Sequence, residues 1–474
     1  MYFAYMLKYK NLYWIVIIAL GLNSCAKNYT SGKLPMVYLD VDGQIRPDDK
    51  IDGEFSIEIE NRTVVTGKMG IEYRGSTSYR LSDKKSYGFE IRKSSGDGTP
   101  KALLGMPAQS DWILMGHVIR SNGPDDLYAY DPTLMHHYIG YELARGIGMY
   151  AARCRWVELT VNGQYQGVYV LMEKPKADRM RIDVGEPFGR KEPGITGGYI
   201  LKIDKTASYA PTGRELSYYD NNWGDDANYL PYISFRSDYD LKGDLLDFEP
   251  FRPPYHDQQY RETYFLHEFP KPSELNEQMR TYISDYVHDF ESAIIFDHLN
   301  GTNTVSEYID LETFADGFIM NELAGNIDAY RISTFLHKPR NGKLRFGPIW
   351  DLNIGYGRQG RVPWEDWIAN YNHYVSQDAW MVPFWWEMFL ESPEFKSTVK
   401  SRWTQYRSGP LSDAAIFGLV DETQGRLLST GAAERNYDLW RAENRTINFE
   451  DEVDFLRYYL EQRLAWMDGE IAAW

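Results

Sequence analysis

The chain has 474 residues, of which 43% are hydrophobic and 15% aromatic, so it can bury a core large enough for two lobes or two domains. Its formal net charge of -17 argues against nucleic acid as a partner, because phosphate backbones are bound by basic surfaces. Cys25 and Cys154 are the only cysteines, which excludes a fold held together by several disulfides.

The N-terminus has the features of a signal peptide. Its apolar run, residues 12–22, is far shorter than the about 18 residues needed to cross a bilayer. The sequence Leu-Asn-Ser-Cys at 22–25 resembles a bacterial lipoprotein signal, in which Cys25 becomes the lipidated first residue of the mature protein. We therefore predict a signal peptide over residues 1–24 and a polar tether over 25–33. An ordinary signal peptide cleaved nearby is the alternative.

Lipidation of Cys25 would leave Cys154 without a partner for an intramolecular disulfide. It would also place the protein at a membrane surface outside the cytoplasm, in the periplasm or at the outer membrane. No acidic run follows Cys25, which favours the periplasmic face over display at the cell surface.

The rest of the chain divides by pattern. Residues 34–205 contain short alternating runs separated by Gly, Asn and Asp, which predict a sheet-rich lobe with one helix near 134–148. Residues 206–272 are rich in Tyr, Asp, Pro and Asn without sustained periodicity and are expected to be an irregular connector. Residues 273–474 carry repeated helical patterns, beginning at a proposed N-cap, Ser273. The pattern as a whole predicts an α+β fold with a helical second lobe.

One stretch, residues 321–357, is predicted to place two carboxylates together. A helix over 311–323 should end at Gly325, and Asp328 follows it. Strands over Arg331–Lys338 and Lys343–Trp350 are then joined by Asn341-Gly342, a pair that favours a tight hairpin turn. Asp351 follows the second strand.

Asp328 and Asp351 should meet, because antiparallel strands of similar length begin and end at the same edge of a sheet. A protein kinase uses a similar arrangement, in which one aspartate orients the acceptor hydroxyl and the other holds the metal ion that bridges the nucleotide phosphates. Asp328 would take the first role and Asp351 the second. Taken singly, each aspartate is better explained as a turn or capping residue.

Six short motifs occur in order along most of the chain. They are YRGSTS at 73–78, KKSYGFEI at 84–91, DWIL at 111–114, VNGQYQGVYVLMEK at 161–174, GGYILKID at 197–204 and FGPIWDLNIGYG at 346–357. Together they resemble the CotH kinase family, atypical secreted kinases named for a spore-coat protein. The resemblance implies a bilobal, protein-kinase-like fold, binding of ATP and Mg²⁺, and phosphoryl transfer to a Ser, Thr or Tyr hydroxyl of a protein substrate.

The chain departs from ordinary protein kinases in three respects. No HRD precedes Asp328, Ser333 stands where an asparagine would follow it, and the first half lacks a GxGxxG phosphate loop. The family also often carries basic residues after Asp131, where this chain has Met-His-His at 135–137. These departures leave open a kinase-like binding lipoprotein without activity. A glycosidase is the third alternative, because paired carboxylates and many aromatic residues also suit sugar chemistry.

Four further residues are candidates for nucleotide contacts. Lys85 is predicted to neutralise phosphate charge, with Glu173 as its ion-pair partner, by analogy with kinases. Arg74 precedes a glycine and several hydroxyls that could hold a phosphate, and Asn353 could be a second metal or phosphate contact. The plainer readings are a solvated strand lysine, a surface salt bridge at Glu173, a simple turn at Arg74, and a hairpin exit at Asn353. The acceptor protein, the nucleotide preference and the oligomeric state are not encoded in any recognisable pattern.

Overall fold

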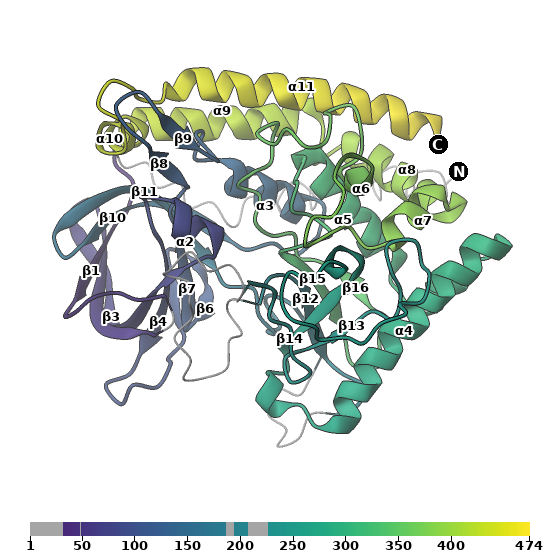
Figure 1. The fold of residues 1–474 in the computed structure, drawn as a ribbon. Coiled ribbons are helices and arrows are strands. Elements are labelled where there is room, and N and C mark those ends of the chain that lie inside the picture. Colours follow the sequence, from purple (N-terminus) through teal and green to yellow (C-terminus); the bar gives the residue numbers. More distant parts are fainter. Residues whose placement is uncertain (1–31, 48, 186–193, 207–225) are drawn as a thin grey trace, which may run out of the picture.

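The computed structural model of the protein describes residues 32–47, 49–185, 194–206 and 226–474. This part of the chain forms two lobes (Figure 1), a β-barrel at one end and a second sheet with most of the helices at the other. The predicted α+β, bilobal fold is confirmed. Cys25 and the predicted signal peptide lie outside the described residues.

The first lobe is built around a closed barrel, which has seven strands in the part of the chain that the structure describes. Alternate side chains point inward, where Phe55, Phe89 and Trp112 belong to one buried cluster. Only β1 and β10 run parallel; the other neighbours within this barrel are antiparallel. In barrel order the strands are β1 (Met36–Val41), β10 (Cys154–Val161), β11 (Gln164–Glu173), β7 (Asp111–Met115), β4 (Ser86–Arg92), β3 (Arg62–Arg74) and β2 (Ile51–Ile59).

The second lobe contains a larger sheet than predicted, since only the hairpin strands, β15 and β16, were expected there. Its described strands, in order, are β13 (Ser234–Arg236), β14 (Tyr264–Phe269), β12 (Tyr199–Ile203), β15 (Thr334–Lys338) and β16 (Arg345–Phe346). β12 was expected in the first lobe, yet it pairs with β14 and β15. The region 206–272, expected to be irregular, supplies β13 and β14. Alternating hydrophobicity marks a strand without naming its partner, so both expectations were wrong.

The helices lie mostly in the second lobe. Figure 1 shows α4 beside the second sheet, and α9 and α11 running along each other over α3. None of the helices in the described part of the chain has both the length and the apolar character needed to cross a membrane. They are α2 (Thr77–Leu81), α3 (His136–Gly146), α4 (Glu277–Asn300), α5 (Leu311–Ala324), α6 (Tyr371–Tyr374), α7 (Trp385–Glu391), α8 (Pro393–Arg407), α9 (Asp413–Ser429), α10 (Ala432–Leu439) and α11 (Phe449–Ala473).

Short elements complete the fold. Two small hairpins flank the barrel, and short 3₁₀ turns connect strands and helices of the second lobe. These are β5 (Lys101–Leu103) with β6 (Met106–Gln109), β8 (Ile119–Ser121) with β9 (Leu127–Ala129), and the turns η4 (Gln259–Arg261), η5 (Pro272–Glu274), η6 (Thr304–Glu307) and η7 (Ile368–Asn370).

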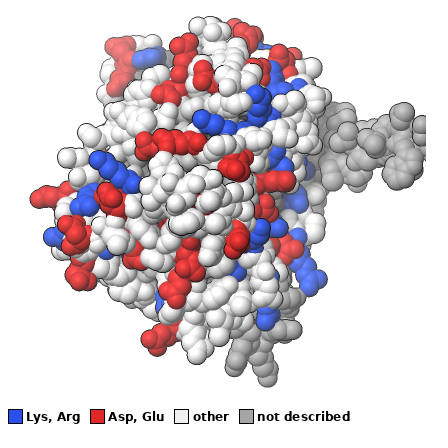
Figure 2. Space-filling model, turned by 90° about the vertical axis from the view of Figure 1, so that its right-hand side faces the viewer, with Lys and Arg blue, Asp and Glu red and all other residues white. Residues whose placement is uncertain are grey.

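On the face drawn in Figure 2, acidic and basic side chains are interspersed.

α4 begins later than predicted. Ser273 lies in a 3₁₀ turn, and the N-cap is Asn276, whose side chain accepts a hydrogen bond of 2.9 Å from the backbone N–H of Met279. The predicted apolar face is nevertheless buried along the helix, from Met279 to Ile294. At the other end, Gly301 adopts the left-handed conformation that closes a helix.

The hairpin next to the predicted carboxylates is shorter than its pattern suggested. Residues 331–333 form turns and β15 begins at Thr334, while β16 covers only Arg345 and Phe346. Asn341 has the left-handed φ of 56° expected of the turn. α5 does end at Gly325, with φ 55°, as predicted. The loops at both ends of the hairpin are therefore longer, and they carry the acidic residues.

Candidate active site

Asp351 lies in the loop after β16, in a backbone conformation that non-glycine residues rarely adopt, with φ 58°. Strained backbone of this kind clusters at functional sites. Its backbone N–H donates to the Tyr141 hydroxyl at 3.4 Å, and its side chain is 31% exposed. Burial raises the pKa of the carboxyl, but His137, Lys202 and Arg74 outweigh burial and hold the pKa below its usual value. The carboxylate is therefore kept ionised.

Asp328 lies in the turn after α5, and its side chain is only 14% exposed. Its Oδ1 accepts a hydrogen bond of 2.7 Å from Nη2 of Arg331. Burial raises the pKa of Asp328; Arg331 acts in the opposite direction, the charge of Asp351 adds to the rise, and the net result is a raised pKa. Among the described residues no hydrogen-bond donor reaches the second oxygen, Oδ2.

The two carboxylates share one electrostatic environment. Asp351 contributes to the raised pKa of Asp328, and both contribute to that of Tyr130, which burial and its neighbours raise to about 12. Two acidic groups whose environments shift their pKa values in opposite directions are the usual sign of divided roles, one group a permanent anion and the other a proton acceptor.

Two cationic side chains, Arg74 and Lys202, act on the Asp351 carboxylate, and a third, Lys174, is close enough to Arg74 for its pKa to be lowered by that charge. Arg74 ends β3, Lys174 follows β11 and Lys202 lies in β12. Burial lowers the pKa of both Arg74 and Lys174. Neither side chain donates a hydrogen bond to another described residue, and the Arg74 guanidinium lies 5.7 Å from the centre of the Trp350 ring. Both therefore have donors available for an anion.

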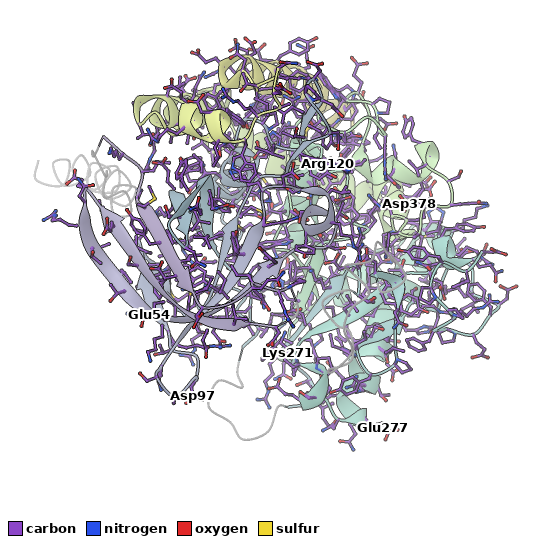
Figure 3. The ribbon with its side chains drawn as sticks, turned by 60° about the vertical axis from the view of Figure 1, so that its left-hand side comes forward. Glu54, Asp97, Arg120, Lys271, Glu277 and Asp378 are labelled. Atoms are coloured by element: carbon purple, nitrogen blue, oxygen red, sulfur yellow. The ribbon has the colours of Figure 1, made fainter. Side chains whose placement is uncertain are left out.

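These cations gather where the lobes meet. Lys271, labelled in Figure 3 between the barrel and the second sheet, is close enough to Lys174 to contribute to its lowered pKa, whereas Glu268 acts against that shift. Lys202 forms an ion pair with Asp204 and stands 5.3 Å from the centre of the Phe335 ring. The site thus combines carboxylates of the second lobe with cations of both lobes.

Comparison with protein families matches residues 71–467 to the family described as CotH kinase protein. The match covers most of the chain and includes every residue of the site described above. The chain belongs to the CotH kinase family. A comparison with curated proteins finds no match. CotH membership supports a kinase-like function and, in general, the use of ATP and a divalent metal ion.

The CotH site fits an anionic nucleotide and a cation. Arg74 and Lys174 have free donors, and Asn353, two residues beyond Asp351, has a buried Oδ1 without a hydrogen-bond partner in the described part of the chain. No three His, Cys, Asp or Glu side chains within that part form a ready-made metal cage. Asp351 and Asn353 are the residues that would hold a cation here, and Mg²⁺ in nucleotide sites usually has only one or two protein ligands.

The expected pairing of Lys85 with Glu173 is wrong. Lys85 precedes β4, and its ammonium donates to the carbonyl oxygens of Tyr79 and Ser82, at 2.7 and 2.6 Å, at the end of α2. Glu173 instead pairs with two arginines, Arg153 and Arg181, each at 3.0 Å. Lys84 and Lys85 both precede β4, so the alternation of side chains along a strand does not determine where they point.

The other lysine of that motif has a structural role. Lys84 is fully buried and donates to the Val168 carbonyl at 2.5 Å and to Oδ1 of Asn436 at 2.7 Å. Burial lowers its pKa well below the usual value, while the nearby charge of Asp131 opposes that shift. Lys174 and Lys202 were not predicted as members of the site, although each lies in one of the six motifs.

Asp204 and Ser333 also join the site and were not predicted as members. Asp204 accepts a hydrogen bond of 3.1 Å from the backbone N–H of Ser333, and the Ser333 hydroxyl lies 3.5 Å from Oδ2 of Asp351. Ser333 stands five residues after Asp328, the position of the asparagine in ordinary kinases, and its left-handed φ of 51° turns the chain between the two aspartates. That spacing was the available signal.

Proposed function

We propose that this CotH-family protein transfers the γ-phosphoryl group of ATP, with Mg²⁺, to a Ser, Thr or Tyr hydroxyl of a protein. The observation that supports the proposal best is the pair of carboxylates, Asp328 and Asp351. They are electrostatically coupled, and their pKa values are shifted in opposite directions. Cationic side chains with free hydrogen-bond donors lie nearby. Bound ATP and its cation supply the transferable group and neutralise charge on the phosphates.

The side chains divide the remaining work. Asp351, held ionised, is the cation ligand, with Asn353 as a second contact. Oδ2 of Asp328 accepts the hydrogen bond of the acceptor hydroxyl and then its proton, while Arg331 fixes Oδ1. Arg74, Lys174 and Lys202 donate to phosphate oxygens.

Asp351→Ala tests the proposal directly. We expect the variant to lose divalent-cation-dependent labelling by a photoreactive ATP analogue at least about 100-fold, because one carboxylate supplies most of the cation's protein contact. Its melting temperature should fall only modestly, because the lowered pKa means that the ionised carboxylate stabilises the fold, but the side chain is 31% exposed and its nearest hydroxyl donor is 3.5 Å away.

Asp97→Ala is the matched control, because Asp97 lies at the outer end of the first lobe (Figure 3) and should label as wild type does. Labelling of Asp351→Ala within a few-fold of wild type would defeat the assignment.

We further propose that the protein acts outside the cytoplasm, held at a membrane by lipid on Cys25. The lipoprotein-like signal supports this placement, which would make secreted or surface proteins the available acceptors.

A further inference from the structure

His137, the second residue of α3, is buried beside Asp351 without satisfying its ring nitrogens. The side chain is 2% exposed, and neither nitrogen has a hydrogen-bond partner in the described part of the chain. Buried polar atoms are nearly always paired, so an unpaired imidazole beside a functional carboxylate requires an explanation. The ring contacts Tyr141 edge-on, at 5.7 Å between centres, which packs it without using either nitrogen.

The distance between His137 and Asp351 suits a metal ion bound by both side chains. Nε2 of His137 lies 3.7 Å from Oδ1 of Asp351, longer than the about 3.2 Å limit of a good hydrogen bond. Two atoms that share one metal ion at about 2.1 Å each can lie up to about 4.2 Å apart. A distance of 3.7 Å is therefore too long for a direct bond and short enough for a shared cation.

The loop that carries Asp351 contains another buried polar atom without a hydrogen-bond partner in the described part of the chain. Asn353, two residues after Asp351, keeps its buried Oδ1 unpaired, while its carbonyl oxygen lies 3.1 Å from Nδ1 of His136. α3 is thus fixed to this loop through His136, and His137 is set beside the carboxylate. The candidate ligands are therefore an imidazole nitrogen of His137, the carboxylate of Asp351 and the amide oxygen of Asn353.

Resting on the proposed role of Asp351, we propose that His137 is a second protein ligand of the same cation and makes the site prefer a divalent first-row transition metal over Mg²⁺. Mg²⁺ is a hard ion that takes oxygen ligands, whereas transition-metal ions accept imidazole nitrogen. Mn²⁺ is the weakest binder of that series, so a preference measured with Mn²⁺ is a demanding test.

Pulsed electron paramagnetic resonance of Mn²⁺ bound to the full chain with ADP tests direct coordination. Wild type should show the coupling of a directly bound nitrogen, and labelling the protein with ¹⁵N-histidine should change that coupling from ¹⁴N to ¹⁵N. This experiment needs no variant, so it holds even if a substitution at His137 prevents folding. Bound Mn²⁺ with no histidine coupling would overturn the inference and leave the proposed function standing.

Calorimetry on His137→Asn tests selectivity. We expect at least a 10-fold loss of Mn²⁺ affinity and less than a 2-fold change for Mg²⁺ in the presence of ADP. His117→Asn is the matched control, because His117 is also buried with unpaired nitrogens but lies 3.9 Å from Asp131 instead of Asp351. Equal losses for both metals, or an unchanged Mn²⁺ affinity, would refute the role of His137. Wild type that binds neither metal would count against the proposed function as well.

Discussion

The carboxylates of Asp328 and Asp378 are both held by Arg331, yet their pKa values shift in opposite directions. Asp378 accepts a hydrogen bond of 2.7 Å from the Tyr371 hydroxyl, and although burial raises its pKa, this bond and the nearby arginines lower it overall. The pKa of Asp328 is raised, mainly by burial. An ionised Asp328 therefore reduces folding stability, as expected of a group kept for chemistry.

Asp328→Asn should remove activity and spare stability. A folded-state pKa above the unfolded value means that the group's stabilising contribution is complete below the unfolded pKa, about 3.9, and is lost as pH rises through the folded pKa. At pH 7 the variant should melt at or above the wild-type temperature, and the two should converge towards pH 3. Phosphoryl transfer should fall about 10²- to 10⁴-fold, with nucleotide binding retained.

Asp378→Asn is the control, because the pKa of Asp378 is shifted in the opposite direction. Its lowered pKa means that the ionised carboxylate stabilises the fold above the unfolded pKa. That stability is lost as pH falls through the folded pKa. It should melt below wild type at pH 7. Wild-type activity itself should decline as pH falls through the raised pKa of Asp328. An Asp328→Asn variant that melts well below wild type at pH 7 would contradict the assignment.

At the scale of elements, α3 and the loop after β16 approach so closely at residue 140 that any larger side chain there would displace side chains of the loop. A Cβ added to Gly140 would lie 2.1 Å from Cδ1 of Leu352 and 3.0 Å from the Tyr356 hydroxyl. Leu352 and Tyr356 are buried in the same loop that carries Asp351, so a shift of either side chain would disturb the packing next to the site.

Gly140→Ala should therefore weaken cation-dependent ATP-analogue labelling at least about 10-fold without changing any ligand, and cost about 1 to 3 kcal/mol of unfolding free energy. Gly418→Ala in α9 is the control, because no atom lies within 4 Å of its added Cβ. Alanine should raise the unfolding free energy there by about 1 kcal/mol, since it favours a helix more than glycine does. Labelling and denaturant unfolding measure both. Wild-type labelling by Gly140→Ala would show that the loop does not depend on α3.

At the scale of the whole molecule, α10 fastens the helical lobe to the barrel. Oδ1 of Asn436 accepts hydrogen bonds from Nζ of Lys84 at 2.7 Å and from the backbone N–H of Val168 at 3.1 Å. Arg435, next to it, forms two hydrogen bonds with Glu158 of β10. These contacts join segments more than 250 residues apart in sequence.

Asn436→Ala should lower the unfolding free energy by about 2 to 4 kcal/mol, because it leaves the buried Lys84 ammonium with a single hydrogen-bond partner. Adding Lys84→Met should recover part of the loss, since the double variant no longer buries an under-paired charge. Calorimetric melting checks both variants. If the double variant is no more stable than Asn436→Ala, the buried charge is not the cause.

Cys25→Ala tests the position of the molecule. The variant should lose metabolic lipid labelling and move to the soluble fraction, because the acyl chains provide the proposed anchorage. Wild type serves as the lipidated reference. A variant that still fractionates with membranes in high salt, where charge attraction is screened, would show that lipid is not the anchor.

The sequence by itself determined the local structure and the main pair of the candidate site. Apolar spacing located α4 and α5, glycine placed the end of α5, and the hairpin pattern put Asp328 and Asp351 on either side of one strand pair. These features depend on residues close together in the chain, where periodicity and turn chemistry act directly. The six ordered motifs also sufficed to indicate the family.

Only the tertiary structure decided which distant segments meet. β12 pairs within the second sheet, Glu173 pairs with arginines instead of Lys85, and His137 lies beside Asp351, 214 residues further along the chain. A period of two or 3.6 fixes the face of a side chain but carries no information about the surface packed against it. The partners of buried charges are therefore set by how the barrel, α3 and the second sheet pack together.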